Sequence, residues 1–124
     1  LTMRGGDVYR HAVVRMTEAS TEVLERAGLT VADVDLVVAH QANRRILEAV
    51  AQRLGVPDDR CHLTVQDHGN TSAASIPLAL EDARARGRLV GGERVLLTAF
   101  GAGLTWAACL VRWSGPDDGA AVRA

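Results

Sequence analysis

The feature that most constrains the fold of this 124-residue chain is an apolar run of strand length at residues 35–39, Asp-Leu-Val-Val-Ala. The run lacks the polar alternation of a half-exposed strand, so it predicts a strand buried on both faces. Before it, residues 8–27 carry apolar side chains at three- and four-residue steps and end at Gly28, a residue suited to a left-handed helix cap. After it, residues 43–54 return to helical spacing and end at Gly55. The chain therefore begins as alternating helix and strand.

The second half of the chain extends this alternation. The predicted elements are a short strand at 63–65, a polar loop at 66–72, a helix at 75–86, strands at 94–100 and 105–113, and a polar tail at 114–124. Alternation that ends in two successive strands predicts an α/β fold with a mixed, mostly parallel sheet packed with helices. The length suits one hydrophobic core, which we place in residues 1–113.

Composition excludes several classes of function. Fourteen basic residues against fifteen acidic ones give a formal net charge of -1, which does not suit a nucleic-acid-binding surface or a polybasic membrane anchor. No apolar run is long enough to span a bilayer. Cys61 and Cys109 form no C-x-x-C pair, so we expect reduced packing thiols in a cytoplasmic protein. Because the chain opens on Leu1 rather than Met, we also expect it to be a fragment of a longer protein.

Three polar features lie just beyond predicted strands. These are His40, the loop that contains Asn70, and the turn from Gly101 to Gly103. Because ligands bind beyond the carboxyl ends of parallel strands, we expect the three to converge. All supply hydrogen-bond donors, and each donor fixed near a developing oxyanion lowers a barrier by about 3–4 kcal/mol. The alternative is that these residues only cap and satisfy their own loops.

The remaining histidines and cysteines do not indicate a metal site. Cys61, His62 and His68 are near one another in the sequence, but their spacing fits no zinc motif and no carboxylate completes the set. We therefore predict no metal. His11 and His62 are interpreted as ordinary helix or surface histidines.

A basic stripe, formed by Arg44, Arg45 and Arg53, begins just after His40. Such a stripe is typical of a solvated helix face. Beside a pocket lined by donors, it also suits a phosphate group or an acidic carrier protein.

Three strings in this sequence resemble a known family: V-A-H-Q-A-N-R-R-I at 38–46, H-G-N-T-S-A-A-S-I-P at 68–77 and F-G-A-G-L-T-W at 100–106. In this order and spacing they resemble the C-terminal half of the ketoacyl-acyl carrier protein synthase III enzymes, which belong to the thiolase superfamily. The resemblance runs from about Arg4 to Trp113. It implies the C-terminal half of a thiolase-like fold.

The resemblance also implies a Cys-His-Asn condensing site for fatty-acid or polyketide initiation. A cysteine is acylated from an acyl-CoA primer, and a malonyl thioester on the carrier protein is decarboxylated to the attacking carbanion. His40 and Asn70 would bond the thioester oxygen as it becomes an enolate, without any cofactor. The other implied roles are an oxyanion-hole N–H from Ala102, substrate or pantetheine contacts from Asn43, Phe100, Gly101 and Gly103, and carrier-protein docking by Arg44, Arg45 and Arg53.

Two departures from the family pattern bear on these roles. Ala102 stands where the family has the middle glycine of its turn, which narrows the allowed backbone angles there. The family's catalytic cysteine belongs to the N-terminal half, and neither Cys61 nor Cys109 matches it. The expected partners are therefore that N-terminal half, a carrier protein, a CoA thioester and a second copy in a homodimer. We also expect an exposed apolar face where the missing half packs.

Two other functions remain open. One keeps the fold but transfers the acyl group to a hydroxyl or an amine. The other is a non-catalytic module that binds the carrier protein through its arginines. Retention of both His40 and Asn70 favours condensation, because a docking module or a simple acyltransferase needs no decarboxylation pair.

Overall fold

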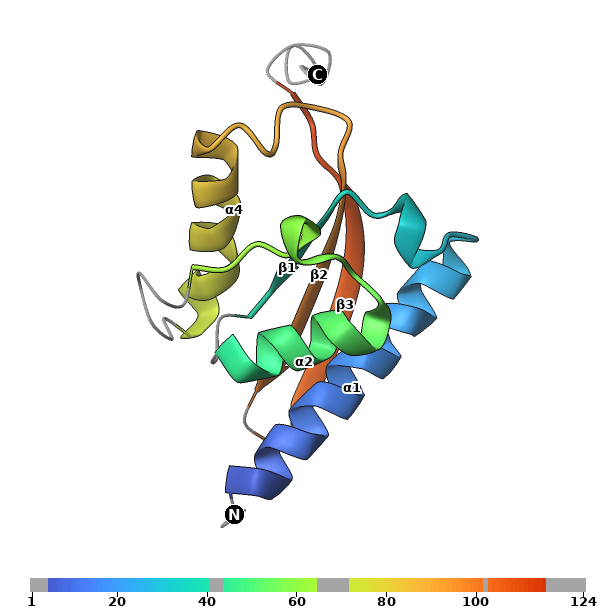
Figure 1. The fold of residues 1–124 in the computed structure, drawn as a ribbon, viewed down its shortest axis with the longest axis vertical. Helices are drawn as coiled ribbons and strands as arrows, with labels where there is room; N and C mark the ends of the chain where they lie inside the picture. Colours follow the sequence, from blue (N-terminus) through green and yellow to red (C-terminus); the bar gives the residue numbers. More distant parts are fainter. Residues whose placement is uncertain (1–4, 41–43, 65–71, 102, 116–124) are drawn as a thin grey trace.

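A mixed sheet with strand order β1-β2-β3 lies at the centre of the described chain (Figure 1). The computed structural model describes residues 5–40, 44–64, 72–101 and 103–115. Their elements in chain order are α1 (Gly5–Arg26), η1 (Val31–Asp33), β1 (Leu36–Ala39), α2 (Arg44–Leu54), η2 (Asp58–Arg60), η3 (Ser72–Ala74), α4 (Ser75–Ala85), β2 (Arg94–Gly101) and β3 (Thr105–Arg112). Most of the predicted loop and tail, at 66–71 and 116–124, lies outside the described residues.

The sheet combines a parallel and an antiparallel ladder. β1 pairs with β2 in parallel, with Leu36 opposite Val95, and β2 pairs with β3 in antiparallel, with Arg94 opposite Arg112. The mixed α/β sheet predicted from the sequence is therefore confirmed. The parallel pair places the carboxyl ends of β1 and β2 at the same edge, and the β2–β3 turn lies at that edge too.

Helices cover both faces of β1, as its unbroken apolar sequence predicts. Val37 and Ala39 face α1 and α2, whereas Leu36 and Val38 face α4. All four residues are buried. Figure 1 shows α4 separated from α1 and α2 by the sheet. The core cluster nearest the carboxyl edge on the α1 and α2 side consists of Ala12, Val13, Met16, Ala39, Ile46, Leu47 and Val50.

The end of α1 confirms the predicted glycine cap. Gly28 has a φ of 69°, a left-handed conformation that costs a glycine little. Leu29 N–H donates to the Leu24 carbonyl at 2.9 Å and Gly28 N–H to the Glu25 carbonyl at 3.0 Å, which is the Schellman pattern. The helix begins at Gly5, three residues before the predicted start at Val8.

The predicted strand at 63–65 is wrong for the residues that are described. Instead, Cys61 forms a single parallel bridge with Val37, and His62 N–H donates to the Val37 carbonyl at 3.0 Å. Leu63 and Thr64 are not in a strand, and Val65 lies outside the described residues. The three residues Leu-Thr-Val carry too little periodicity to specify strand pairing, so the sequence could not distinguish a single bridge from a ladder.

β3 and α4 leave apolar side chains uncovered within the described part of the chain. Trp106 and Val111 of β3 are 42% and 37% exposed, and Leu78 of α4 is 41% exposed. Cys109 on β3 is exposed as well, so its predicted packing role is wrong for this structure, because no described element covers that side of the strand. Trp106 pairs with Phe100 on the α1 side of the sheet and Val111 pairs with Val95 on the α4 side, so the single exposed apolar face expected from the sequence stays a prediction. No helix in the described ranges is both long and apolar enough to cross a membrane.

Candidate active site

His40 lies one residue beyond β1, at the carboxyl edge of the parallel pair. Its backbone N–H donates to the Thr98 carbonyl of β2 at 2.8 Å and so extends the parallel ladder past the strand. Its ring Nδ1 lies 2.5 Å from the hydroxyl oxygen of Ser75, the first residue of α4. Ser75 is 1% exposed, whereas His40 is half-buried. The backbone of His40 is thus held by β2, and its ring is held by α4.

Burial lowers the pKa of His40 below its ordinary value of 6.5, because the partly apolar surroundings disfavour the imidazolium. At neutral pH the ring is therefore uncharged and carries one N–H. Within the described residues, Ser75 provides the only hydrogen bond to the ring. A neutral imidazole with one nitrogen anchored can present the other nitrogen to a ligand.

The turn between β2 and β3 adjoins this edge. Phe100 stacks on Trp106 with ring centroids 6.3 Å apart and an interplanar angle of 12°, and it packs against the core cluster. Gly101 pairs with Thr105 at the end of the antiparallel ladder. Gly103 has a φ of 109°, a conformation that other residues rarely adopt. The tight turn predicted at 101–103 therefore depends on glycine at 103.

The structure brings together only part of the predicted site. His40 and the strand end at Phe100 and Gly101 share the carboxyl edge of the sheet. Asn43, Asn70 and Ala102 lie outside the described residues, and their predicted roles stay predictions.

Sequence reasoning did not single out Ser75 as a partner of His40. The two residues are 35 positions apart, and a serine at a helix start ordinarily indicates only a cap. Its place inside the string H-G-N-T-S-A-A-S was the one available signal.

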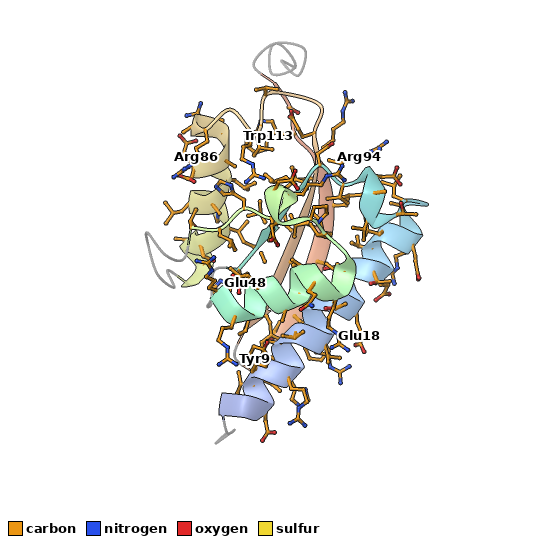
Figure 2. All side chains as sticks on the ribbon, viewed as in Figure 1. Tyr9, Glu18, Glu48, Arg86, Arg94 and Trp113 are labelled. Atoms are coloured by element: carbon orange, nitrogen blue, oxygen red, sulfur yellow. The ribbon has the colours of Figure 1, made fainter. Side chains whose placement is uncertain are left out.

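The arginines of the predicted docking stripe differ in their environments. Arg44 donates to Glu48 one turn along α2 at 2.6 Å, and that bond raises the pKa of Arg44. Arg45 lies over the Tyr9 ring of α1, with 5.4 Å between the guanidinium carbon and the ring centroid. Arg53 is exposed in the last turn of α2. In Figure 2, Tyr9 and Glu48 mark where these contacts occur on α1 and α2.

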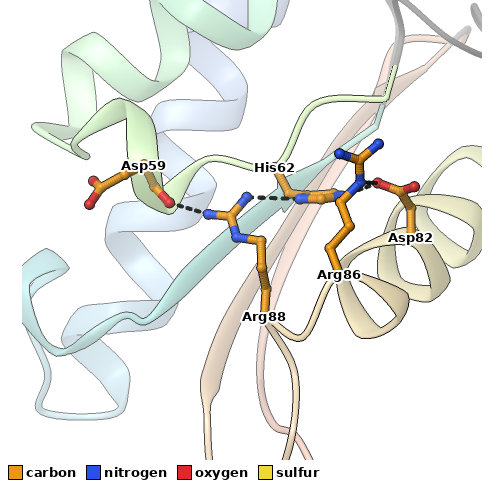
Figure 3. Close-up of polar contacts among 5 residues, drawn as sticks. All are labelled: Asp59, His62, Asp82, Arg86 and Arg88. Atoms are coloured by element: carbon orange, nitrogen blue, oxygen red, sulfur yellow. Dashed lines mark hydrogen bonds and ion pairs between the residues drawn. The ribbon is translucent and has the colours of Figure 1, made fainter.

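A second histidine, His62, is the buried centre of a polar cluster (Figure 3). It is 4% exposed, so its interpretation as an ordinary surface histidine is wrong. Its Nε2 lies 2.7 Å from a carboxylate oxygen of Asp82, and its Nδ1 lies 2.8 Å from Nη1 of Arg88. Arg88 also donates to the Asp59 carbonyl, and Arg86 donates to Asp82 at 2.9 Å. These polar partners replace water around the buried ring.

The partners of His62 determine its protonation. Arg88 can only donate, so Nδ1 accepts and the ring proton is on Nε2, which donates to Asp82. Burial lowers the pKa of His62 more than the Asp82 hydrogen bond raises it, which keeps the ring neutral. Both ring nitrogens are engaged by protein groups, so this histidine joins parts of the fold and has no nitrogen to offer a ligand.

Within the described residues, the Cys61 thiol does not indicate a nucleophilic site, and the His, Cys, Asp and Glu side chains do not indicate a metal site. Burial raises the pKa of Cys61 to about 11, so the thiolate is scarce at neutral pH. Within the described ranges, no group of three His, Cys, Asp or Glu side chains is arranged to hold a metal ion, and His68 lies outside them. An open groove of about 610 Å³ between α2 and η2 is lined by Arg44 and Cys61, among others, but not by His40.

Comparisons with known proteins agree with these features. Residues 24–113 match the family described as 3-oxoacyl-[acyl-carrier-protein (ACP)] synthase III C terminal. A beta-ketoacyl-[acyl-carrier-protein] synthase III of Nitratidesulfovibrio vulgaris is 58% identical over 111 residues, which are 90% of this chain and 34% of that protein.

Two solved structures are similar to this chain. The synthase III of Aquifex aeolicus superimposes with a TM-score of 0.88 and 46% identity over 90% of this chain and 36% of that one. The priming beta-ketosynthase of the R1128 polyketide pathway gives a TM-score of 0.85 and 42% identity over 93% of this chain and 35% of that one. The predicted thiolase-like fold class is confirmed, and the chain spans about a third of the length of these relatives.

Proposed function

The chain belongs to the family of 3-oxoacyl-[acyl-carrier-protein] synthase III C-terminal domains, and from this premise we propose that it supplies the decarboxylation donors of a condensing enzyme. The reaction is the decarboxylative Claisen condensation of an acyl-CoA primer with a malonyl group on an acyl carrier protein. The observation that carries the proposal is the neutral His40 imidazole at the carboxyl edge, anchored through Nδ1 by Ser75.

The role of His40 follows from where charge develops in this reaction. When the bond from the malonyl α-carbon to its carboxylate breaks, CO₂ leaves and the electron pair is delocalised onto the thioester oxygen. A fixed N–H donor stabilises that oxygen, and each such donor is worth about 3–4 kcal/mol. The N–H of a neutral imidazole is a very weak acid. It therefore keeps its proton through this step and stabilises the enolate as a hydrogen-bond donor. The side-chain amide of Asn70 serves as the second donor.

The acyl-accepting cysteine is assigned to another part of the enzyme. Cys61 has a pKa near 11, which makes it a weak nucleophile at neutral pH, and Cys109 lies within β3. The relatives are about three times as long as this chain, which leaves room for a further segment that carries the nucleophile. That segment also provides a cover for the exposed apolar side chains of β3 and α4. The complete enzyme acts as a homodimer.

The carrier protein docks on the basic stripe of α2. The charge of Arg44 is already paired with Glu48, whereas Arg45 rests on the Tyr9 ring, so Arg45 is the better placed cation for an acidic carrier. Arg45→Glu weakens carrier binding more than Arg44→Glu does, and added salt reduces the difference. Steady-state KM values for the malonyl carrier measure this, with Arg26→Glu at the far end of α1 as the control. Equal effects of the two changes would contradict the assignment.

The decisive experiment separates decarboxylation from acylation in a full-length synthase III that carries this segment. His40→Ala lowers malonyl decarboxylation and condensation by about 10²–10³-fold. It leaves acylation by acetyl-CoA intact, as followed by intact mass spectrometry. Asn70→Ala gives the same pattern. His11→Ala, at an exposed position on α1, is the matched control and changes neither step.

Each alternative has its own outcome. Retained condensation in His40→Ala would refute the proposed role of that residue. Acetylation of Cys61 or Cys109 would refute the assignment of the nucleophile to another half. Transfer of the acyl group to a hydroxyl or an amine without malonyl decarboxylation would identify an acyltransferase, and carrier binding without any turnover would identify a docking module.

A further inference from the structure

We propose that Ser75 is a positioning residue that sets the tautomer of His40, so that the ring proton lies on Nε2 and is directed to the substrate. The inference rests on the proposed function, in which His40 acts as a hydrogen-bond donor. It starts from one contact, the 2.5 Å separation between His40 Nδ1 and the hydroxyl oxygen of Ser75.

A neutral imidazole exists in two tautomers, and its partners decide between them. If Nδ1 carried the proton, it would donate to the Ser75 oxygen, and Nε2 would present a lone pair. That lone pair would repel a developing enolate oxygen. If the hydroxyl of Ser75 donates to Nδ1 instead, Nε2 keeps the proton and becomes the donor that decarboxylation needs.

Local structure holds the Ser75 hydroxyl in place. Ser75 is 1% exposed, and α4 packs Ala79 and Ala83, further along its buried face, against β1 at 0% exposure. The methyl side chains allow the helix to lie close to the strand that carries His40 at its end. Both partners of the bond are therefore attached to packed elements, which limits the freedom of the ring to turn.

The geometry of His40 also prevents an easy exchange of partners. Its own backbone N–H is bonded to Thr98 at 2.8 Å, so the Cα position is fixed relative to β2. With the backbone held by β2 and Nδ1 by α4, the side of the ring that bears Nε2 is the one left to face a substrate. The rotation of His40 is thus set from within this chain, and the direction of the Ser75 hydrogen bond decides its tautomer.

The test uses Ser75→Ala and Ser75→Thr in the full-length synthase III that carries this segment. Ser75→Ala removes only the hydroxyl, and by analogy with residues that orient metal-bound histidines, malonyl decarboxylation falls about 10- to 100-fold. The loss is in kcat, with little change in the KM for the malonyl carrier. Ser75→Thr restores the hydroxyl and with it much of the rate. Acylation by acetyl-CoA stays unchanged in both variants.

A second measurement reads the tautomer without any turnover. Selective ¹⁵N labelling of histidine, with His40 assigned by its absence in His40→Ala, distinguishes the two neutral forms by their proton–nitrogen couplings. In the unmodified enzyme His40 shows the proton on Nε2, and in Ser75→Ala the two forms mix. Either an unchanged rate or an unchanged tautomer in Ser75→Ala would overturn the proposal.

The results for these variants distinguish a failure of the positioning role of Ser75 from a failure of the proposed function. If His40→Ala retains decarboxylation, the proposed function fails, whereas the NMR measurement still tests the Ser75 bond. If His40→Ala abolishes decarboxylation and Ser75→Ala does not slow it, only the positioning role fails. When Ser75→Ala is combined with His40→Ala, the decarboxylation rate falls no further than in His40→Ala, because Ser75 acts through His40 alone.

Discussion

Among the described residues, two histidines are buried or half-buried, and both contact helix α4 but differ in whether a ring nitrogen is left for a ligand. His40 contacts Ser75 at the start of α4, and His62 contacts Asp82 seven residues later, about two helical turns along. Burial lowers the pKa of both rings. His62 has both nitrogens bonded to protein, whereas His40 has one bonded within the described residues. The number of engaged nitrogens, more than burial or pKa, separates a structural imidazole from one that can act on a ligand.

The strongest test of this comparison replaces each histidine by alanine in the full-length enzyme. His62→Ala leaves the donor of Arg88 and the acceptor of Asp82 without their buried partner, which costs about 1–3 kcal/mol of unfolding free energy. His40→Ala loses one hydrogen bond at a half-exposed site and costs less than about 1.5 kcal/mol. Catalysis responds in the opposite order. Urea unfolding midpoints and decarboxylation rates per folded molecule measure the two effects.

Two results would break the comparison. Equal destabilisation by both variants would show that His40 is as much a structural residue as His62. A loss of decarboxylation in folded His62→Ala as large as in His40→Ala would show that the His62 cluster controls the site through α4.

The pH dependence of stability sharpens the comparison further. Both imidazoles have a folded pKa below 6.5, so just below that pH the unfolded chain binds protons that the folded protein does not. Stability is therefore unaffected by these groups above pH 6.5 and falls as the pH drops below it, until the folded pKa values are passed. His62→Gln, which cannot titrate, removes its share of that slope. Unfolding free energies measured from pH 8 to pH 5 check this, and an unchanged slope in the variant would contradict it.

Asp82 contributes in a separate, more acidic window. Burial raises its pKa, but the hydrogen bond from His62 together with the charge and hydrogen bond of Arg86 outweigh burial and lower it below 3.8. The stabilisation from this carboxylate is present above pH 3.8 and is lost as the pH falls through the lowered value. In Asp82→Asn, unfolding free energies show a shallower acid limb below pH 4, whereas the slope that begins near pH 6 extends to lower pH, because the carboxylate that raises the pKa of His62 is gone.

Local sequence patterns predicted the parts of this fold whose interactions are local or periodic. The apolar run at β1, the cap at Gly28 and the position of His40 after a buried strand all follow from a few neighbouring residues. The cluster around His62 could not be predicted in this way. Its partners Asp82 and Arg88 are 20 and 26 positions away, and polar residues at such distances show no pattern until the chain is folded. The wrong prediction of a strand at Leu63 and Thr64 has the same origin, since sheet pairing is a long-range property.

The smallest expected effect is the difference in unfolding free energy between replacing Arg86 and replacing Arg88, the two arginines of the His62 cluster. Arg88 donates to His62 and to the Asp59 carbonyl, whereas Arg86 pairs only with Asp82 among the described residues, and its side chain is 61% exposed. Arg88→Met therefore removes one hydrogen bond to the buried ring and one to the exposed Asp59 carbonyl, and costs about 1 kcal/mol. Arg86→Met removes one solvated ion pair and costs about 0–0.5 kcal/mol. The two changes remove the same charge on either side of Gly87, so each is the matched control for the other.

Differential urea unfolding at low and high salt distinguishes the two contributions. The effect of Arg86→Met shrinks as salt screens the exposed pair, whereas that of Arg88→Met persists because Arg88 bonds a buried, uncharged ring and a backbone carbonyl. Equal and equally salt-sensitive effects would mean that Arg88 acts on His62 only as a surface charge. In that case Nδ1 of His62 would not be held by protein, and the distinction drawn between the two histidines would no longer rest on engaged ring nitrogens.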